Sequence, residues 1–294
     1  MKLKTIVIRG CFKADYFRDT DGWIISTNCN LYQIILMRLT ATFLFIFICI
    51  CVKGNAQNDP VGSGVYHWNE LPVKKEKQRE SRHILEGSTA EFSWFEIHAT
   101  TQYKGAAPKP AHAQDSTEEL IIIKEGILTC TVGNKTTALG PGSVLMIAPH
   151  DLQSFENRGN EPVTYYVLMF RSRLPMDLQR SSNAGGSFFI NADTLIYTEK
   201  EDKGTRKYFE KPTAMCSNYE MHTTTLNKKG PSHAPHQHVD TEIILVISGD
   251  VEMTIDGNHY QGSSGDLFIA ESGKMHGVGN AGDKPCTYFA FKWR

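Results

Sequence analysis

The sequence predicts an all-β protein in which one small β-sandwich or β-barrel unit occurs twice. Three observations carry this prediction: an internal repeat, many short Val/Ile/Thr/Phe/Tyr-rich segments bounded by glycine, and no sustained helical periodicity in residues 90–172 or 214–294. The 294 residues suffice for one or two domains with a buried core. The 31 basic and 32 acidic residues nearly cancel, which argues against a nucleic-acid groove or a polybasic membrane face.

Residues 37–56 are typical of an export signal. The basic Arg38 follows Met37, an apolar run covers residues 41–52, and a small-residue cleavage site ends at Ala56. The run is shorter than the roughly 20 residues that a helix needs to span a bilayer. We therefore expect cleavage after Ala56, a secreted or periplasmic location, and no stable membrane insertion once the signal is removed.

Residues 1–36 precede this signal and show no clear periodicity. Because a signal peptide begins at the initiator methionine, we expect translation to start at Met37 and residues 1–36 to be a non-native upstream extension. Cleavage would leave Cys130, Cys216 and Cys286. An odd number excludes a full disulfide framework, although one bridge is allowed, and free buried thiols are favoured.

An internal repeat organises the remainder of the chain. The segment Phe95–Thr101 resembles Tyr219–Thr225 at an offset of 124, and Glu119–Ile123 resembles Glu242–Val246 at an offset of 123. The offset of 123 then relates these pairs: Gly126 and Gly249, Gly142 and Gly265, Asn157 and Asn280, Pro162 and Pro285, Tyr165 and Tyr288. We place the one-residue change in the Gly/Pro/Lys-rich loop between the two blocks. The predicted divisions are an N-terminal copy (57–175), a linker (176–187) and a C-terminal copy (188–294).

Within each copy the pattern is strand, tight turn, strand. Gly133-Asn134 follows Thr129–Val132, and Asp256-Gly257 follows Glu252–Ile255, so each pair supplies turn residues suited to positive φ. Buried strands bounded by glycine are expected at Val144–Ile147 and Leu267–Ala270. The linker ends in a Ser/Asn/Gly-rich stretch, and one helical turn is expected near Pro175.

Metal-ligating residues concentrate in the second copy. His236 and His238 are two residues apart, so on a strand their side chains share one face, and Glu242 has the same parity. His276 comes from a later strand. Three imidazoles and one carboxylate in one barrel interior would form a site for one divalent transition metal, with positions left for water or substrate.

The spacing of these residues resembles two motifs of the cupin superfamily. Gly230 to Gly249 fits the pattern Gly, five residues, His-x-His, three or four residues, Glu, six residues, Gly. Gly265, Gly273, His276 and Asn280 fit the second motif, in which Glu271 replaces a proline. The resemblance implies a bicupin over residues 60–294: two tandem jelly-roll β-barrels (double-stranded β-helices) with Mn, Fe, Ni, Zn or Cu inside the second. It also allows a homodimer.

The first copy is expected to lack this site. An offset of 123 places these residues at the four ligand positions: Ala113, Asp115, Glu119 and Gln153. Alanine cannot bind a metal, and His112 lies one residue out of register, where its side chain would point to the opposite face. We therefore expect a degenerate site without a tight transition metal; a calcium-like oxygen site from Asp115, Glu119 and Gln153 is the weaker alternative.

The resemblance implies an exported metal-dependent enzyme that acts on a small oxygen-rich metabolite, with dioxygenase or decarboxylase chemistry favoured. One alternative is a metal-dependent hydrolase or isomerase such as a ureidoglycine aminohydrolase-like bicupin, although that ligand set begins with Glu and ends with Gln. Another is a non-catalytic cupin that binds a sugar or other small ligand. His233 is the one candidate catalytic residue, as a general base or an extra ligand; a solvated loop histidine is its alternative role.

Overall fold

A computed structural model describes residues 59–294 fully, together with the backbone of residues 6–8, 12–19 and 22–26. The chain divides into two compact units, residues 1–56 and 57–294, and the division coincides with the predicted end of the signal. In the first unit, β1 (Ile6–Ile8), β2 (Phe12–Asp19) and β3 (Gly22–Ser26) form an antiparallel sheet, where the sequence had indicated no regular structure. The predicted signal peptide lies outside the described residues.

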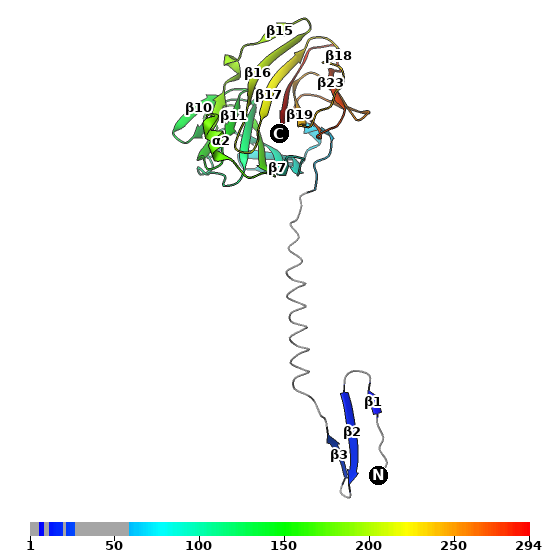
Figure 1. Ribbon diagram of the computed structural model, residues 1–294. Coiled ribbons are helices and arrows are strands. Elements are labelled where there is room, and N and C mark those ends of the chain that lie inside the picture. Colours follow the sequence, from blue (N-terminus) through cyan, green and yellow to red (C-terminus); the bar gives the residue numbers. More distant parts are fainter. Residues whose placement is uncertain (1–5, 9–11, 20–21, 27–58) are drawn as a thin grey trace. The chain divides into compact units, whose positions relative to one another are not determined.

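The second unit is all-β, and each copy pairs a seven-stranded sheet with a smaller one (Figure 1). The large sheet of the first copy has the order β14-β11-β8-β13-β7-β6-β5, and its small sheet has the order β10-β9-β12. The strands of these sheets are β5 (Val73–Glu76), β6 (Arg79–Gly87), β7 (Phe92–Gln102), β8 (Glu118–Glu125), β9 (Leu128–Val132), β10 (Lys135–Leu139), β11 (Val144–Ile147), β12 (Gln153–Glu156), β13 (Val163–Ser172) and β14 (Phe188–Ile190).

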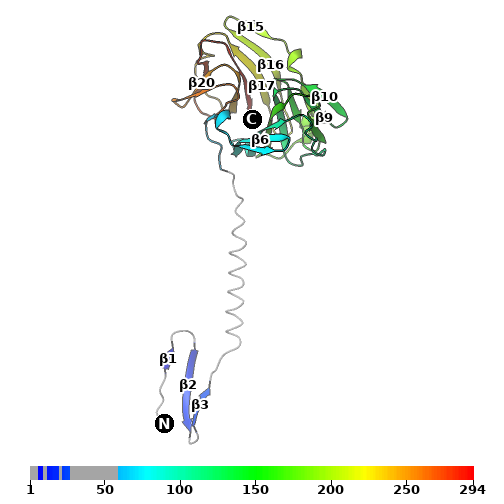
Figure 2. The same cartoon turned by 180° about the vertical axis from the view of Figure 1, so that it is seen from behind.

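The second copy repeats this arrangement. Its sheets have the orders β15-β16-β17-β24-β19-β22-β4 and β18-β23-β20-β21. Figure 2 shows β20 on one side of this unit and β9 and β10 of the first copy on the other. The strands are β4 (Gly64–Tyr66), β15 (Thr198–Lys200), β16 (Lys203–Lys211), β17 (Tyr219–Leu226), β18 (Gly230–Pro231), β19 (Thr241–Ser248), β20 (Val251–Ile255), β21 (Asn258–Gly262), β22 (Leu267–Ala270), β23 (His276–Asn280) and β24 (Cys286–Trp293).

The duplication and the turns predicted from it are confirmed. Strands β6 and β16 are 124 residues apart along their whole length, and β8 and β19 are 123 residues apart. The two predicted hairpins are β9–β10 and β20–β21, with positive φ at Gly133, Asp256 and Gly257. Gly126 and Gly249 also have positive φ, and a Cβ at either would lie within 2.6 Å of a backbone carbonyl oxygen, so no other residue fits these turns.

The two copies exchange their first strands across the predicted boundary between them. Strand β4 lies in the N-terminal stretch but pairs with β22 of the second copy, whereas β14 pairs with β11 of the first. Each exchanged strand leads into a short 3₁₀ helix, η1 (Trp68–Glu70) or η2 (Ala192–Thr194). Sequence similarity places β4 and β14 each in its own repeat. Their backbone hydrogen bonds nevertheless join each strand to the edge of the other copy's sheet.

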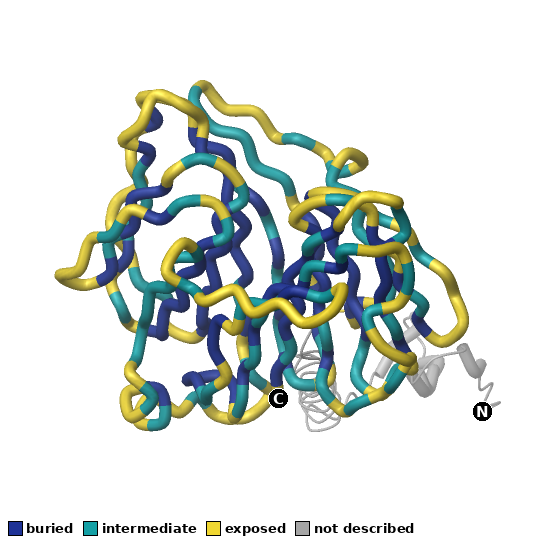
Figure 3. Tube along the Cα trace, turned by 90° about the horizontal axis from the view of Figure 1, so that it is seen from above, coloured by how far each residue is buried: buried dark blue, intermediate teal, exposed yellow. Residues whose placement is uncertain are grey.

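Buried hydrophobic residues form three clusters, one inside each copy and one between the copies. Figure 3 marks the buried segments of the chain in dark blue. Alternation along β19 and β24 sends one face of each strand into its own barrel and the other toward the first copy. Phe92 stacks on Trp293 across this interface, with ring centroids 5.0 Å apart. The interface also holds Glu118, which accepts hydrogen bonds from the Thr213 hydroxyl and the Ala214 and Met215 amides.

The connection between copies contains α2 (Leu178–Asn183), near the predicted helical turn, and the Asp177 side chain accepts a hydrogen bond from the first turn. Cys130, Cys216 and Cys286 are free and buried, as expected. Among the described residues, no helix combines the length and hydrophobicity needed to cross a bilayer.

Candidate metal centre

The four predicted ligands converge inside the second barrel. Ligand atoms of His236, His238, Glu242 and His276 all lie within 4.8 Å of one another. The imidazole Nε2 atoms of His238 and His276 are 2.9 Å and 3.0 Å from the same Glu242 carboxylate oxygen. The side chain of His276 is 4% exposed and that of Glu242 is 14% exposed, so the cluster is largely shielded from water.

Backbone pairing brings the ligands together, although not all of them lie on strands. Glu242 is in β19 and His276 opens β23, whereas His236 forms an isolated β-bridge with His276. His236 and His238 do not lie on one strand, because His238 is in the loop before β19. The His238 carbonyl is held by the amide of Gly273, 2.8 Å away, which ties this loop to the turn before His276.

Hydrogen bonds to the backbone orient two of the imidazoles. His238 Nδ1 donates to the Asp240 carbonyl at 3.0 Å, and His276 Nδ1 donates to the Lys274 carbonyl at 2.8 Å. When each ring is neutral, its only proton is therefore on Nδ1, and the Nε2 lone pair faces the cluster. Nδ1 of His236 is buried and has no hydrogen-bond partner among the described residues. The arrangement and chemistry of these donors fit a divalent transition metal.

The electrostatics keep the carboxylate ionised. Burial alone would raise the pKa of Glu242, but His238 and His276, which donate to it through Nε2 when they are protonated, outweigh burial and hold the pKa well below its usual range. Burial and the neighbouring imidazoles of His276 and His233 lower the pKa of His236, which favours its neutral form. An anionic carboxylate and a neutral imidazole are the protonation states that bind metals.

A cavity of about 220 Å³ adjoins the cluster. His233 lies at this cavity, and its ring centroid is 4.7 Å from that of His236. Lys203, Ser232 and Lys292 also line the cavity and were not identified from the sequence. Inward parity on β24 could have indicated Lys292. Ser232 is at a variable position of the first motif, and Lys203 comes from a segment with no recognisable motif.

The cavity also has an acidic and an apolar part. Glu220 and His222 line it from β17, and their nearest side-chain atoms are 3.5 Å apart. Burial is the main reason that the pKa of His222 is lowered. The remaining lining is formed mainly by Thr224, Ile244, Val278, Tyr288, Ala290 and Phe291.

The first copy contains an equivalent cluster, but its register differs from the prediction. His112 and Gln153 exchange two backbone hydrogen bonds, just as His236 and His276 do. Likewise the His150 amide donates to the Gln114 carbonyl, the counterpart of the Gly273–His238 bond. His112 and Gln114 therefore occupy the positions of His236 and His238, and the assignment of Ala113 and Asp115 is wrong. The extra residue of the first copy lies in the loop after Gln114, immediately before β8.

Glutamine amides replace imidazoles around Glu119. Gln114 and Gln153 each donate an amide hydrogen bond to this buried carboxylate, at 2.7 Å and 2.9 Å. Asp115 is exposed and takes no part, so the calcium-like alternative of Asp115, Glu119 and Gln153 does not assemble. Among the residues that the structure describes, the second-copy cluster is the one group of His, Cys, Asp and Glu ligands found.

The departure from the cupin motif at Glu271 has a structural reason. The Ser63 amide and hydroxyl both donate to the Glu271 carboxylate, and the Glu271 amide donates to the Ser63 hydroxyl. Glu271 thereby attaches the N-terminal stretch to the turn that leads to His276. Asn280 also has a structural role, because its amide donates to the Leu226 and Lys284 carbonyls. Lys274 pairs with Asp256 at 2.9 Å on the surface.

Comparisons with known proteins agree with this fold. A cupin domain model matches the chain twice, over residues 100–169 and 222–292. The structure of Ylba from E. coli has a TM-score of 0.60 at 15% identity and covers 81% of this chain and 94% of its own. No curated protein sequence matches the chain.

Two oxalate decarboxylases have the same fold. The Lactobacillus farciminis enzyme, solved as a formate complex, gives a TM-score of 0.62 at 10% identity and covers 80% of this chain and 87% of its own. A mutant of OxdC from Bacillus subtilis gives 0.61 at 14% identity, with 79% and 78% covered. The fold and the cluster together define a two-domain β-barrel protein with one potential metal site. The chain belongs to the cupin superfamily and is a bicupin.

Proposed function

We propose that this bicupin is a metal-dependent enzyme that acts on a small oxygen-rich metabolite, with decarboxylase or dioxygenase chemistry. The convergence of His236, His238, Glu242 and His276 beside a cavity of about 220 Å³ carries the proposal. The cavity is smaller than the sites of about 300–1,000 Å³ that hold drug-sized ligands, which favours a substrate of few heavy atoms. The structural likeness to oxalate decarboxylases is consistent with this substrate size.

The four residues would hold one Mn, Fe, Ni, Zn or Cu ion through three imidazole nitrogens and one carboxylate. Such an ion, when bound, supplies a Lewis acid that polarises a substrate oxygen. The carbonyls of Asp240 and Lys274 keep the His238 and His276 rings in the orientation and tautomer that ligation requires.

The other side chains of the cavity would position the substrate and exclude water. Ile244, Val278 and Ala290 form an apolar wall, and Thr224, Ser232 and Tyr288 bring hydroxyl groups to it. Apolar walls lower the effective dielectric constant and so strengthen contacts between the substrate and the charged groups. His233 is exposed beside His236, so it is accessible to exchange a proton with a bound molecule.

Metal content, measured by elemental mass spectrometry, tests the proposal. Protein covering residues 57–294, which form a compact unit, should retain one equivalent of a transition metal, and the double variant His236→Ala/His238→Ala should lose it. Assays with oxalate and glycolate should then reveal CO₂ release without O₂ uptake for a decarboxylase, or O₂ uptake for a dioxygenase. Absence of bound metal in the wild type would refute the enzyme proposal.

We also propose that the protein is exported. The signal-like pattern of residues 37–56 supports this, as does the start of the compact unit at residue 57. N-terminal sequencing of protein expressed from Met37 in a bacterium with a secretion pathway should read from Gln57. A mature protein that still begins at Met37 would contradict export by cleavage.

A further inference from the structure

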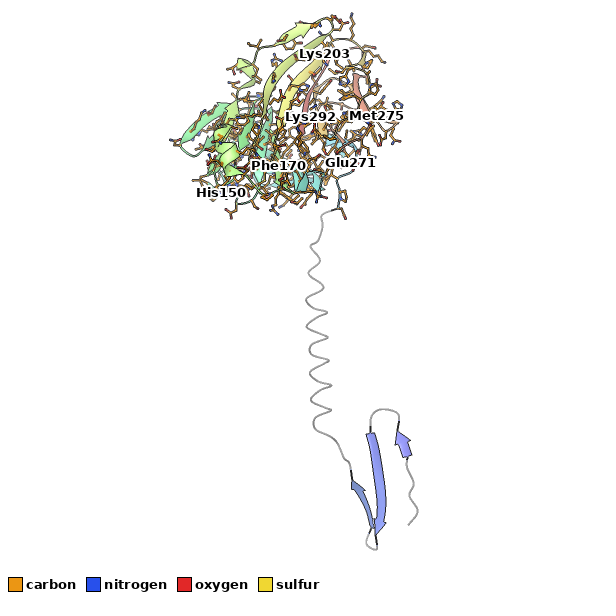
Figure 4. The ribbon with its side chains drawn as sticks, viewed as in Figure 1. His150, Phe170, Lys203, Glu271, Met275 and Lys292 are labelled. Carbon is orange, nitrogen blue, oxygen red and sulfur yellow. The ribbon has the colours of Figure 1, made fainter. Side chains whose placement is uncertain are left out.

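Two lysines from different strands, Lys203 and Lys292, line the cavity beside the His/Glu cluster, hereafter the metal cluster. Both are labelled in Figure 4. Lys203 is the first residue of β16, and Lys292 is near the end of β24. In the sheet register, Lys292 stands between Glu220 of β17 and the ligand Glu242 of β19. The inner wall of the barrel therefore carries a row of alternating charge at the level of the metal cluster.

Lys203 has no acidic partner. Its ammonium group donates to the Ser232 hydroxyl at 2.9 Å, and among the described residues no carboxylate oxygen lies within 4.0 Å of it. The side chain is half-buried, and this burial lowers the pKa of Lys203. Lys292, by contrast, lies 3.7 Å from a carboxylate oxygen of Glu220. A partly buried cation held only by a hydroxyl group is incompletely neutralised.

The corresponding cation of the first copy is in a different environment. Arg79, 124 residues before Lys203, lines a separate cavity together with Glu76, Glu80 and Glu96. Its guanidinium group donates to the Ala107 carbonyl. Both cavities thus hold carboxylates, but one of the two in the cavity of Lys203, Glu242, belongs to the His/Glu cluster.

The charge of the loaded site gives a second argument. Glu220 and Glu242 balance Lys203 and Lys292, so a bound divalent ion would leave its two positive charges uncompensated. Positive charge in a cavity with apolar walls favours binding of an anion. Few water molecules screen the charges there, so the attraction between them is stronger than in bulk water.

We propose that Lys203 and Ser232 bind a carboxylate group of the substrate, while a second oxygen of the same molecule faces the metal cluster. The substrate class is accordingly a short hydroxy-, oxo- or dicarboxylate. This inference rests on the proposed function for the role of the metal, but the lysine contact can be measured separately. Lys203 is a specificity-determining residue in this proposal.

Isothermal titration calorimetry of the metal-loaded protein tests the contact, with glycolate and oxalate as probes and uncharged glycolamide for comparison. Loss of a charge-assisted hydrogen bond predicts that Lys203→Met weakens glycolate binding about 10- to 100-fold. Glycolamide binding should change little. Lys203→Arg, which keeps the charge, should restore part of the affinity. Lys207→Met is the matched control, since Lys207 lies on the same strand but is exposed and pairs with Glu210 at 2.8 Å.

Metal content and thermal unfolding of each variant separate the possible outcomes. Unchanged glycolate affinity in a folded, metal-loaded Lys203→Met protein would overturn the inference and leave the proposed function standing. Equal affinity for glycolate and glycolamide in the wild type would also overturn it. If the wild type binds no metal, the proposed function fails. Titration of the metal-free wild type and the metal-free Lys203→Met variant with glycolate still decides whether Lys203 binds a carboxylate. Lys203→Gln provides a second variant should Lys203→Met fail to fold.

Discussion

Glu119 in the first copy accepts hydrogen bonds from two glutamine amides, whereas Glu242 in the second contacts two imidazoles. An amide nitrogen always carries its protons and has no free lone pair, so Gln114 and Gln153 satisfy the buried carboxylate without an ion. A neutral imidazole with its proton on Nδ1 instead presents a lone pair at Nε2. This difference between side chains accounts for a potential metal site in only one of the two described copies.

Two substitutions should therefore create a second metal site. The double variant Gln114→His/Gln153→His would place imidazoles beside Glu119 and His112, in the register of the second copy. We expect metal content to rise from one equivalent to two, as measured by elemental mass spectrometry. The single variant Ala113→His, based on the incorrect register, is the control and should remain at one equivalent. A double variant that folds but gains no metal would show that ligand identity alone does not explain the difference.

At the level of elements, the exchanged strand β4 is connected to the metal cluster through Ser63 and Glu271. Ser63 immediately precedes β4, and Glu271 immediately follows β22, with which β4 pairs. Ser187 holds the same position 124 residues later, where its hydroxyl accepts a hydrogen bond from the Ala148 amide at 2.8 Å. The two serines thus fasten equivalent turns in the two copies, but only the second turn leads to a metal-ligating histidine.

Removal of either serine hydroxyl should destabilise the fold, whereas only removal of the Ser63 hydroxyl should weaken metal binding. Ser63→Ala and Ser187→Ala should each reduce the free energy of unfolding by about 1 kcal/mol. Ser63→Ala should in addition weaken metal binding several-fold, because the turn before His276 loses its attachment. Competition with a chelator measures the affinity, and chemical denaturation measures the stability. Equal metal affinity in the two variants would contradict this role for Ser63.

At the scale of the whole molecule, strand exchange and the shared core make the two copies interdependent. β4 and β14 each complete a sheet of the other copy, and the Phe92–Trp293 stack joins the cores. Glu118 adds a polar connection, since its buried carboxylate accepts three hydrogen bonds from residues 213–215. Neither copy can unfold alone without exposing this interface to water.

We expect one cooperative unfolding transition for residues 57–294, with equal calorimetric and van't Hoff enthalpies. Glu118→Ala would leave buried donors of the second copy without an acceptor and should lower the free energy of unfolding by about 2–5 kcal/mol. Glu252→Ala, at an exposed position on β20, is the control and should change it by less than about 0.5 kcal/mol. Two resolved transitions in the wild type would show that the copies fold independently.

The sequence by itself determined the all-β class and the duplication, and it identified the four residues that form the His/Glu cluster of the second copy. These features depend on patterns visible in the sequence: alternation along strands, glycine at turns with positive φ, and the spacing of His236, His238 and Glu242. Within the first copy, the same patterns could not locate an inserted residue in a loop, because a loop can absorb one residue before or after Gln114 without altering any strand.

Only the tertiary structure decided which sheet β4 and β14 join, which residues face Glu119, and that Lys203 and Ser232 line the cavity of the metal cluster. Each of these depends on contacts between segments far apart in the chain. Strand pairing at a sheet edge is set by backbone hydrogen bonds, which are chemically alike for almost every residue type and so leave little trace in the sequence.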